Sequence, residues 1–231
     1  MVPPTASPID GEKPNGPRSR KGVQTRARLV EAAKKIFEKH GFLDARISDI
    51  AEEAGLSHGS FYHYFESKDE VFLEVAEAEE DRLSSHSVVD SGLLDPSSDA
   101  TVRERLRESN RRYLADYRDE ARIMGVIEQV SRYHDQVRDV RFARQRLYTK
   151  QTEDSIRLLQ SQGLADPQLD PAIAAPALTA MVTRFAEMWL VQNLLDCSFD
   201  EGVEQLTMLC VNALQLKDRP GRRERRRENP T

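Results

Sequence analysis

The sequence lacks the features that mark several classes of protein. Its 231 residues include only two cysteines, Cys197 and Cys210, which excludes a disulfide framework and fits a reducing cytoplasm. The longest nearly apolar run, residues 172–182, is far shorter than the ~20 residues that span a membrane. Residues 1–22 contain no apolar segment of the kind that a secretory signal needs. We therefore expect a cytoplasmic protein with no membrane partner.

The sequence also lacks the motifs of common enzyme classes. It contains no glycine-rich phosphate loop, no nucleophile motif, and no His, Cys and Glu residues at metal-binding spacing. The five histidines are scattered along the chain. We therefore expect no enzymatic activity, no catalytic residues, no metal and no cofactor.

The distribution of charge matters more than its sum. The chain holds 39 acidic and 34 basic residues, a net charge of −5 that by itself argues against a nucleic-acid partner. Counted by segment, however, residues 13–48 carry +7, residues 71–216 carry −9 and residues 217–231 carry +4. A basic N-terminal region on an acidic body can bind an anion locally although the molecule is negative in total.

Hydrophobic periodicity predicts an all-α protein, because no stretch alternates as a β-strand does. The expected helices span about 24–40, 47–54, 58–64, 100–119, 121–134, 137–162, 170–195 and 200–216, and a further helix starts at residue 68. We divide the chain into a disordered basic arm (1–22), a DNA-binding domain (23–68), a helical ligand-binding and dimerisation domain (69–216) and a disordered Arg-rich tail (217–231). The arm and the tail either solvate the ends of the chain or touch DNA.

Two short helices joined by a tight turn stand near the N-terminus. In the turn, Ala54 allows close helix contact, Gly55 permits a sharp bend, Leu56 is apolar, and Ser57 is placed to cap the next helix. This pattern predicts a helix-turn-helix, in which the second helix enters the major groove of DNA.

At this point the sequence resembles the TetR family of transcriptional regulators. The resemblance rests on Gly41-Phe42, on residues 47–57 (ISDIAEEAGLS) and on residues 59–69 (GSFYHYFESKD), and it covers about residues 24–73. It implies a three-helix DNA-binding domain followed by a helical ligand-binding and dimerisation domain. Elsewhere only the helical plan and an apolar final helix pair are similar to the family.

The resemblance also implies which residues meet DNA. Those nearest the base edges would be His58, Gly59, Ser60 and His63, preceded by the helix cap Ser57. Tyr62 and Tyr64 would contact phosphates. Lys68 starts the next helix, whose positive N-terminal end favours a phosphate oxygen. Phe61 and Phe65 are expected in the core, because they share a face with Leu56.

The sequence departs from the family at two positions. Ala45 and Arg46 stand where Thr or Ser is usual, so Arg46 cannot cap its helix but can reach a phosphate with its guanidinium. The recognition helix itself contains no Arg or Lys, so affinity would come mainly from phosphate contacts, with Arg18, Arg20 and Lys21 as further candidates. Alternatively, Tyr62 is an aromatic at the edge of the core, and His58 and His63 are plain solvated residues.

Aromatic and methionine residues gather in the downstream helices. Taken singly, each fits an ordinary helix-bundle core, but as a group they suit an adaptable pocket between helices. Arg184 lies within an apolar helix, where it either meets an anionic group or pairs with Glu187 or Asp196. The candidate pocket residues are Tyr113, Tyr117, Met124, Tyr133, Phe142, Tyr148, Met181, Phe185, Met188 and Trp189.

Together these features favour a ligand-responsive DNA-binding regulator, a repressor that a small apolar or amphipathic effector releases from its operator. In the resembling family the final helix pair forms a dimer interface, so we expect a homodimer through residues 170–216 on a palindromic double-stranded operator. The alternative is a helical protein-interaction module that binds no specific DNA.

Overall fold

The computed structural model describes residues 20–84 and 100–217, and all regular structure within them is helical, which confirms the all-α class. The predicted arm up to residue 19 and the predicted tail from residue 218 lie outside these ranges. No helix in the described ranges is long and apolar enough to cross a membrane. The elements are α1 (Arg20–Asp44), α2 (Ile47–Glu53), α3 (His58–Phe61), α4 (Lys68–Ser84), α5 (Val102–Asp119), α6 (Ala121–Ser131), α7 (Asp135–Ser161), α8 (Pro171–Ala186), the π-helical turn η1 (Glu187–Val191) and α9 (Phe199–Leu214).

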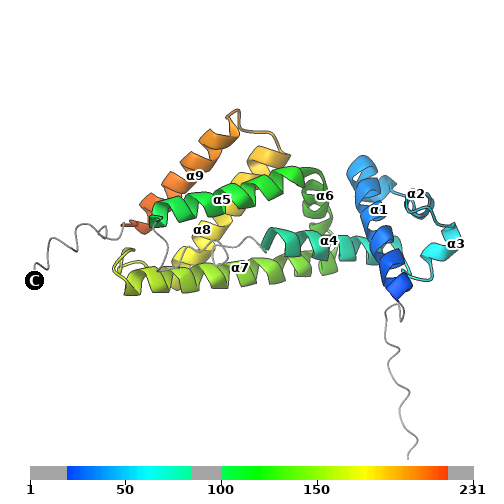
Figure 1. Cartoon of the computed structure of the whole chain (residues 1–231), viewed down its shortest axis with the longest axis horizontal. Helices are drawn as coiled ribbons and strands as arrows, with labels where there is room; N and C mark the ends of the chain where they lie inside the picture. Colours follow the sequence, from blue (N-terminus) through cyan, green and yellow to red (C-terminus); the bar gives the residue numbers. More distant parts are fainter. Residues whose placement is uncertain (1–19, 85–99, 218–231) are drawn as a thin grey trace, which may run out of the picture.

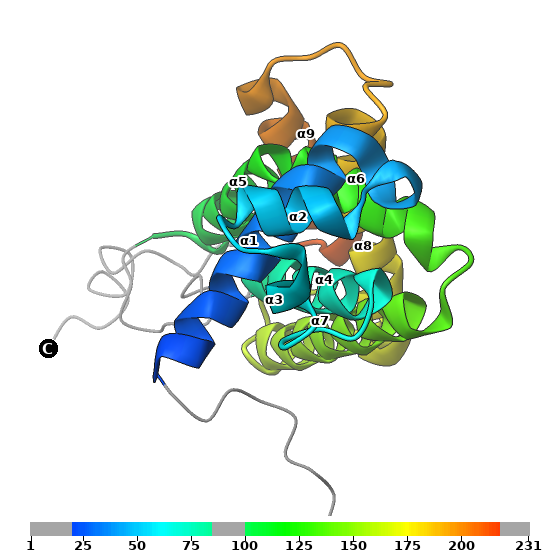
Figure 2. The ribbon, with the colours of Figure 1, turned by 90° about the vertical axis from the view of Figure 1, so that its right-hand side faces the viewer.

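The helices form a small head and a larger body. Helices α1, α2 and α3 make up the head at one end of the molecule, and α5 to α9 make up the body (Figure 1). Helix α4 leads from the head into the body and packs against both α1 and α7. Figure 2 looks onto the head and shows α2 and α3 toward the viewer. The head therefore presents its two short helices away from the body.

Helix α1 begins earlier than the sequence predicts, at Arg20 instead of Gln24, so the last three residues assigned to the arm are helical. Its apolar stripe is buried, with Leu29, Ala33 and Phe37 fully enclosed. Gly41 interrupts the helix near the predicted end, with a φ of 73° that favours glycine, and a further helical turn follows.

The turn between α2 and α3 has the predicted chemistry. Gly55 adopts a φ of 64°, and the Oγ of Ser57 accepts a hydrogen bond from the backbone N–H of Ser60 at 3.2 Å. Helix α3 is shorter than predicted and ends at Phe61 instead of Tyr64. Beyond it the backbone N–H of Tyr64 bonds to the carbonyl of Phe61 at 2.9 Å, a tighter i to i+3 turn of the kind that often ends a helix.

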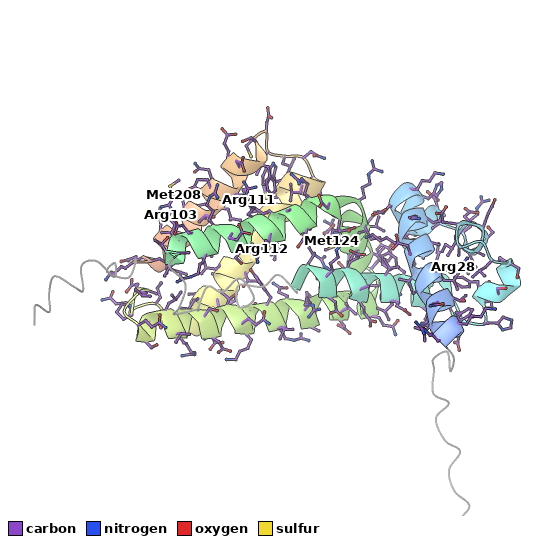
Figure 3. The ribbon with its side chains drawn as sticks, in the orientation of Figure 1. Arg28, Arg103, Arg111, Arg112, Met124 and Met208 are labelled. Carbon is purple, nitrogen blue, oxygen red and sulfur yellow. The ribbon has the colours of Figure 1, made fainter. Side chains whose placement is uncertain are left out.

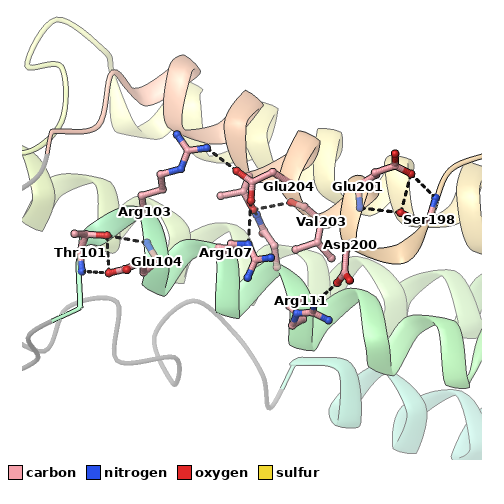
Figure 4. A network of polar contacts seen from close by, with 12 residues as sticks. Thr101, Arg103, Glu104, Arg107, Arg111, Ser198, Asp200, Glu201, Val203 and Glu204 are labelled. Carbon is pink, nitrogen blue, oxygen red and sulfur yellow. Dashed lines mark hydrogen bonds and ion pairs between the residues drawn. The ribbon is translucent and has the colours of Figure 1, made fainter.

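In the body, α9 is fastened to α5 by ion pairs (Figure 4). Arg103 and Arg107 both bind Glu204, at 2.6 and 2.9 Å, and Arg111 pairs with Asp200. Both helices start with a capping box, formed by Thr101 with Glu104 on α5 and by Ser198 with Glu201 on α9. The final helix is therefore held to the body by charge as well as by apolar packing.

One predicted helix ends earlier and less regularly than the sequence predicts. The sequence predicts a continuous helix over 170–195, but α8 ends at Ala186, η1 follows, and Asn193 adopts a positive φ. Trp189 in η1 is buried, and its ring fills the space that a side chain at Gly202 would occupy. The wider π turn thus coincides with the packing of a large ring onto a glycine of α9.

Head and body share one hydrophobic core. Phe37 and Phe61 of the head and Phe72 of α4 belong to the same buried cluster as Ile123 and Leu206 of the body. Helix α1 packs against both α4 and α6. The division of the chain at residues 68 and 69 stays a prediction.

Candidate DNA-binding surface and effector cavity

Helix α3 has one buried and one exposed face. Phe61 and, just beyond the helix, Phe65 are enclosed, as predicted, and their rings lie 5.6 Å apart. Tyr62 is 50% exposed, and its ring meets that of His58 edge to face at 5.4 Å. His63 is exposed as well. The phenylalanines therefore fix the helix to the head while the polar aromatic residues point to solvent.

The residues around this face are positioned by local hydrogen bonds. Ser57 caps α3, and its hydroxyl also bonds the hydroxyl of Ser60 at 2.7 Å. Gly59 is exposed, with no heavy atom of the described residues near a Cβ built on it, so the backbone there is accessible to a partner. Tyr64 is half-buried, and its carbonyl accepts a bond from Arg26. Arg46 is exposed and makes no side-chain cap on α2, as its guanidinium chemistry predicts.

The side chain of Lys68 bonds backbone carbonyls at the end of α1, and the predicted phosphate contact at the start of α4 stays a prediction. Its ammonium donates to the carbonyls of Phe42, Leu43 and Ala45, at 2.7, 3.1 and 3.0 Å, and lies 4.7 Å from the centre of the Phe42 ring. These bonds use the three donors of a lysine. Lys68 therefore stabilises the end of α1, whose last carbonyls have no partner within the helix.

Sequence reasoning missed two arginines that assemble the head. Arg28 donates to the carbonyl of Ala54 and so ties α1 to the turn after α2 (Figure 3). Arg26 bonds the carbonyl of Tyr64, pairs with Glu74 at 2.5 Å, and lies 4.1 Å from the centre of the Phe65 ring. The charge count by segment includes both arginines in the basic N-terminal region. No local sequence pattern shows that their side chains bond backbone carbonyls of the head.

The body contains a cavity of about 330 Å³ between α4, α5, α6, α7 and α8. Five of the predicted pocket residues line it: Tyr113, Tyr117, Met124, Phe142 and Tyr148. Its volume is at the lower end of the roughly 300–1,000 Å³ that small-molecule sites span. Burial raises the pKa of Tyr113 well above its usual value and that of Tyr148 to about 12, so both hydroxyls stay protonated and can donate.

The structure does not bring the other five predicted pocket residues to this cavity. Tyr133 is 54% exposed at the end of α6. Trp189 is buried against Phe199, with ring centres 5.9 Å apart, and against Phe185 at 5.5 Å. Met181 and Phe185 pack on the hydrophobic core, and Met188 belongs to η1. Met181, Phe185, Met188 and Trp189 follow one another in α8 and η1. Helical spacing points these four side chains away from the face that lines the cavity, which carries Thr179, Thr183 and Glu187.

Sequence reasoning also missed the polar part of this lining. Arg138, Arg141 and Arg144 of α7 line the cavity beside Glu80 of α4. Arg141 pairs with Glu80 at 3.4 Å, and burial raises the pKa of that carboxyl although Arg141 opposes the shift. Arg184 lines the cavity and pairs with Glu187 at 2.6 Å, one of the two alternatives that the sequence offers.

Residues 29–75 match the family model described as bacterial regulatory proteins, tetR family. This part of the chain is therefore similar to the TetR family. The chain is 47% identical over 55 residues to the uncharacterised regulator YdgC of Bacillus subtilis, and 31% identical over 75 residues to the transcriptional repressor AcnR of Corynebacterium efficiens. These matches cover 24% and 32% of this chain, and 28% and 39% of the two relatives.

The likeness in fold extends beyond residues 29–75. The crystal structure of a TetR-family regulator from Mesorhizobium loti aligns with 86% of this chain and 98% of its own, with a TM-score of 0.71 and 19% identity. The body therefore has the architecture found in TetR-family regulators, while its sequence has diverged. In sequence the chain matches less than half the length of these curated relatives.

Proposed function

We propose that the protein is a DNA-binding transcriptional repressor that a small apolar or amphipathic effector releases from its operator. The exposed face of α3, carried by a helix-turn-helix similar to the TetR family, is the observation that supports this most strongly. In this proposal residues 23–68 are the DNA-binding domain and residues 69–216 are the ligand-binding and dimerisation domain. The proposal includes no enzymatic role.

The DNA contacts follow from the exposed groups. His58, Gly59, Ser60 and His63 would meet base edges in the major groove, where imidazole and hydroxyl groups can donate or accept. Tyr62 would place its exposed hydroxyl on a phosphate. Arg46, Ser57 and Tyr64 flank this surface and would hold the backbone. The side chain of Lys68 secures the end of α1 beneath the helix-turn-helix, and the predicted phosphate contact would come from the start of α4.

Helix α1 carries basic side chains that would attract the DNA phosphates, whereas α3 contains no Arg or Lys. Arg20, Lys21 and Lys39 are exposed on the head, whereas the body carries the acidic excess. A negative body and a positive head would orient the molecule as it approaches DNA. Because such contacts release counterions, the affinity should fall steeply with added salt.

A two-fold dimer would place two heads on one operator. Ile173 on α8, Leu194 and Leu195 after η1, and Leu209 on α9 are exposed apolar residues, with exposed fractions from 38 to 69%. Their clustering on the final helices supports a homodimer through residues 170–216, since the contact would cover them. The two α3 helices would then enter successive major grooves about 34 Å apart.

Helix α4 would couple the cavity to the head. Its Glu80 and Leu83 line the cavity, while its N-terminal part packs on α1. An effector that favours another position of α4 would change the separation of the two α3 helices and weaken operator binding. The shared core supports this route, because head and body move through common contacts.

Replacing Tyr62 with alanine tests the proposal. We expect affinity for the operator in the DNA upstream of the gene, measured by gel shift, to fall at least tenfold, because the half-exposed side chain would no longer contact a phosphate. Light scattering should show an unchanged assembly state. Tyr62→Phe is the matched control and separates the hydroxyl from the ring. Undiminished DNA affinity in Tyr62→Ala would favour the alternative, a helical protein-interaction module.

A further inference from the structure

The cavity in the body has a charged end and an apolar end. The chain reverses between α7 and α8, so the start of α7 lies beside the end of α8. Ser131, Arg138, Arg141, Arg184 and Glu187 therefore line one end. Tyr148 and Thr179 lie toward the other end. A ligand that fills this space meets different chemistry at its two ends.

Positive charge dominates the charged end. Four arginines line the cavity, at positions 138, 141, 144 and 184, against the two carboxylates of Glu80 and Glu187. Arg138 and Arg184 pair only weakly with the rest of the body, since their partners are Asp135 and Glu187 on the same helical segment, at 2.9 and 2.6 Å. Their side chains are 41% and 53% exposed. The Arg138–Asp135 pair is exposed and contributes little, so Arg138 can turn toward a ligand at small cost. Arg184 is held beside the 12% exposed Glu187 and bonds Gln192 at 3.5 Å, and its remaining N–H donors can bind a second anion.

The other end continues into a second, smaller cavity of about 50 Å³. Tyr148 and Thr179 line both spaces, and the walls of the smaller one include Ile156, Leu159, Leu178 and Leu214. This wall offers dispersion contacts and no charge. An alkyl chain that passes Tyr148 would be removed from water there.

A buried hydroxyl at the junction lacks a partner. Thr179 is 1% exposed, and its Oγ1 makes no hydrogen bond to any described residue. A buried polar group left in this state costs free energy. A polar atom of a bound molecule, or a water held with it, would satisfy the hydroxyl, so the site is built to be occupied.

We propose that this cavity binds an amphipathic carboxylate, with its head group between Arg138 and Arg184 and its apolar chain directed past Tyr148 toward Thr179 and the smaller cavity. Guanidinium groups bind carboxylates with charge-assisted hydrogen bonds, which fixes the orientation of the ligand. The proposal names the class of effector that the proposed repressor would bind. It rests on the proposed function only in the expectation that binding of this ligand weakens operator binding.

Three probes that share a ten-carbon chain test the head-group claim. Isothermal titration calorimetry of the full chain is carried out with decanoate, decanol and decyltrimethylammonium, each below its micelle-forming concentration. We expect decanoate to bind at least tenfold more tightly than decanol, and decyltrimethylammonium not to bind. Equal binding of decanol, tighter binding of the cation, or no binding of decanoate would overturn the proposal.

Variants and a length series locate the two ends. The double variant Arg138→Gln with Arg184→Gln should lose about tenfold in decanoate affinity and keep its affinity for decanol. Arg157→Gln is the control, because Arg157 lies on α7 in a similar exposed pair with Glu153 but outside the cavity. Decanoate should bind the original chain about tenfold more tightly than octanoate, which is two CH₂ groups shorter. Equal loss in the control, or no dependence on chain length, would refute the assigned orientation.

The binding measurements need no DNA, so the two proposals fail separately. A chain that binds decanoate but no operator contradicts the proposed function and leaves the cavity assignment standing. A chain that binds its operator but not decanoate overturns the cavity assignment alone.

Discussion

On α3, adjacent residues have opposite tasks. Phe61 is fully buried and Tyr62 is half exposed, although both are aromatic and sit in one turn. The difference comes from helical geometry, which points neighbouring side chains about 100° apart. One residue therefore anchors the helix and the next is free for a partner.

Phe61→Ala and Tyr62→Ala should separate these tasks. Phe61→Ala removes a buried ring from the core, so we expect it to lower the free energy of unfolding by about 3–5 kcal/mol. Tyr62→Ala changes an exposed position and should stay within about 0.5 kcal/mol. Urea denaturation followed by circular dichroism measures both. Similar losses in the two variants would show that the assigned faces of α3 are wrong.

Sequence patterns could predict the apolar residues of the head but not its polar fasteners. Leu29, Phe37 and Phe61 follow a helical period, and burial is the only role that such a period allows. Arg28 and Lys68 resemble any surface cation in the sequence. Their carbonyl partners come from residues 23–26 positions away, so only the folded chain shows which backbone groups they bond.

At the scale of elements, a buried ion cluster joins three helices where the head meets the body. Lys34 of α1 binds Glu79 of α4 at 2.8 Å and Glu120, at the start of α6, at 2.5 Å. The three side chains are only 9 to 13% exposed. Glu38 lies nearby on α1, and its pKa is raised by burial and by Glu120 and Glu79, against the effect of Lys34. The lysine thus offsets a concentration of negative charge.

Lys34→Met should destabilise the protein by about 3–5 kcal/mol, because it removes the cation that pairs with the buried carboxylate of Glu79 and leaves Glu120 with Arg82 alone. Lys35→Met is the matched control. Lys35 lies next to it on the same helix and pairs with Glu53 at 3.3 Å, but both side chains of that pair are more than 40% exposed. The control should lose less than about 1 kcal/mol. Thermal unfolding compares the two variants, and equal losses would contradict the structural role of the cluster.

The loss in Lys34→Met should shrink as the pH falls from 8 toward 5. A carboxyl whose pKa is higher in the folded than in the unfolded protein takes up its proton first in the folded state, which stabilises that state as the pH drops. The pKa of Glu38 is already raised, and removal of Lys34 removes a cause that lowers it. A loss in Lys34→Met that stays constant or grows over this range would exclude the explanation.

Helix boundaries show which features local sequence patterns can predict and which depend on tertiary packing. The capping boxes and the Asp170-Pro171 start of α8 are chemical signals within four residues, and the structure contains them. The end of α8 depends on the packing of Trp189 onto Gly202, thirteen residues later in the sequence. The pocket shows the same division, since the aromatic residues on α5 and α7 reach it and those after residue 180 do not. No pattern within a single helix reports which neighbour it will face.

At the scale of the whole molecule, the exposed leucines of the last two helices predict the assembly state. We expect a dimer of about 53 kDa by light scattering at micromolar concentration, twice the 26.3 kDa of the chain. Leu209→Glu replaces an exposed leucine of α9 with a charge and should shift the protein toward monomer, whereas Arg157→Glu on α7 should not. A monomer in the unmodified protein would remove the basis for a two-fold operator.

The proposed function joins these scales. In the proposed function, the head exposes the recognition face of α3. The core shared by head and body would couple the position of α4 to the head, and a dimer would present two heads to DNA. Each part is needed for a ligand to control binding to two half-sites, because a change of a few Å between the α3 helices is enough to lose register on DNA.

Specific DNA binding is the central claim, and fluorescence anisotropy tests it most directly. A labelled duplex from the region upstream of the gene is titrated with the protein over a range of salt concentrations, beside a scrambled duplex of equal length and composition. We predict at least 10³-fold tighter binding to the upstream duplex and an affinity that falls linearly with salt on logarithmic axes. Equal affinity for the two duplexes, when the upstream region has been tiled completely, would contradict the account.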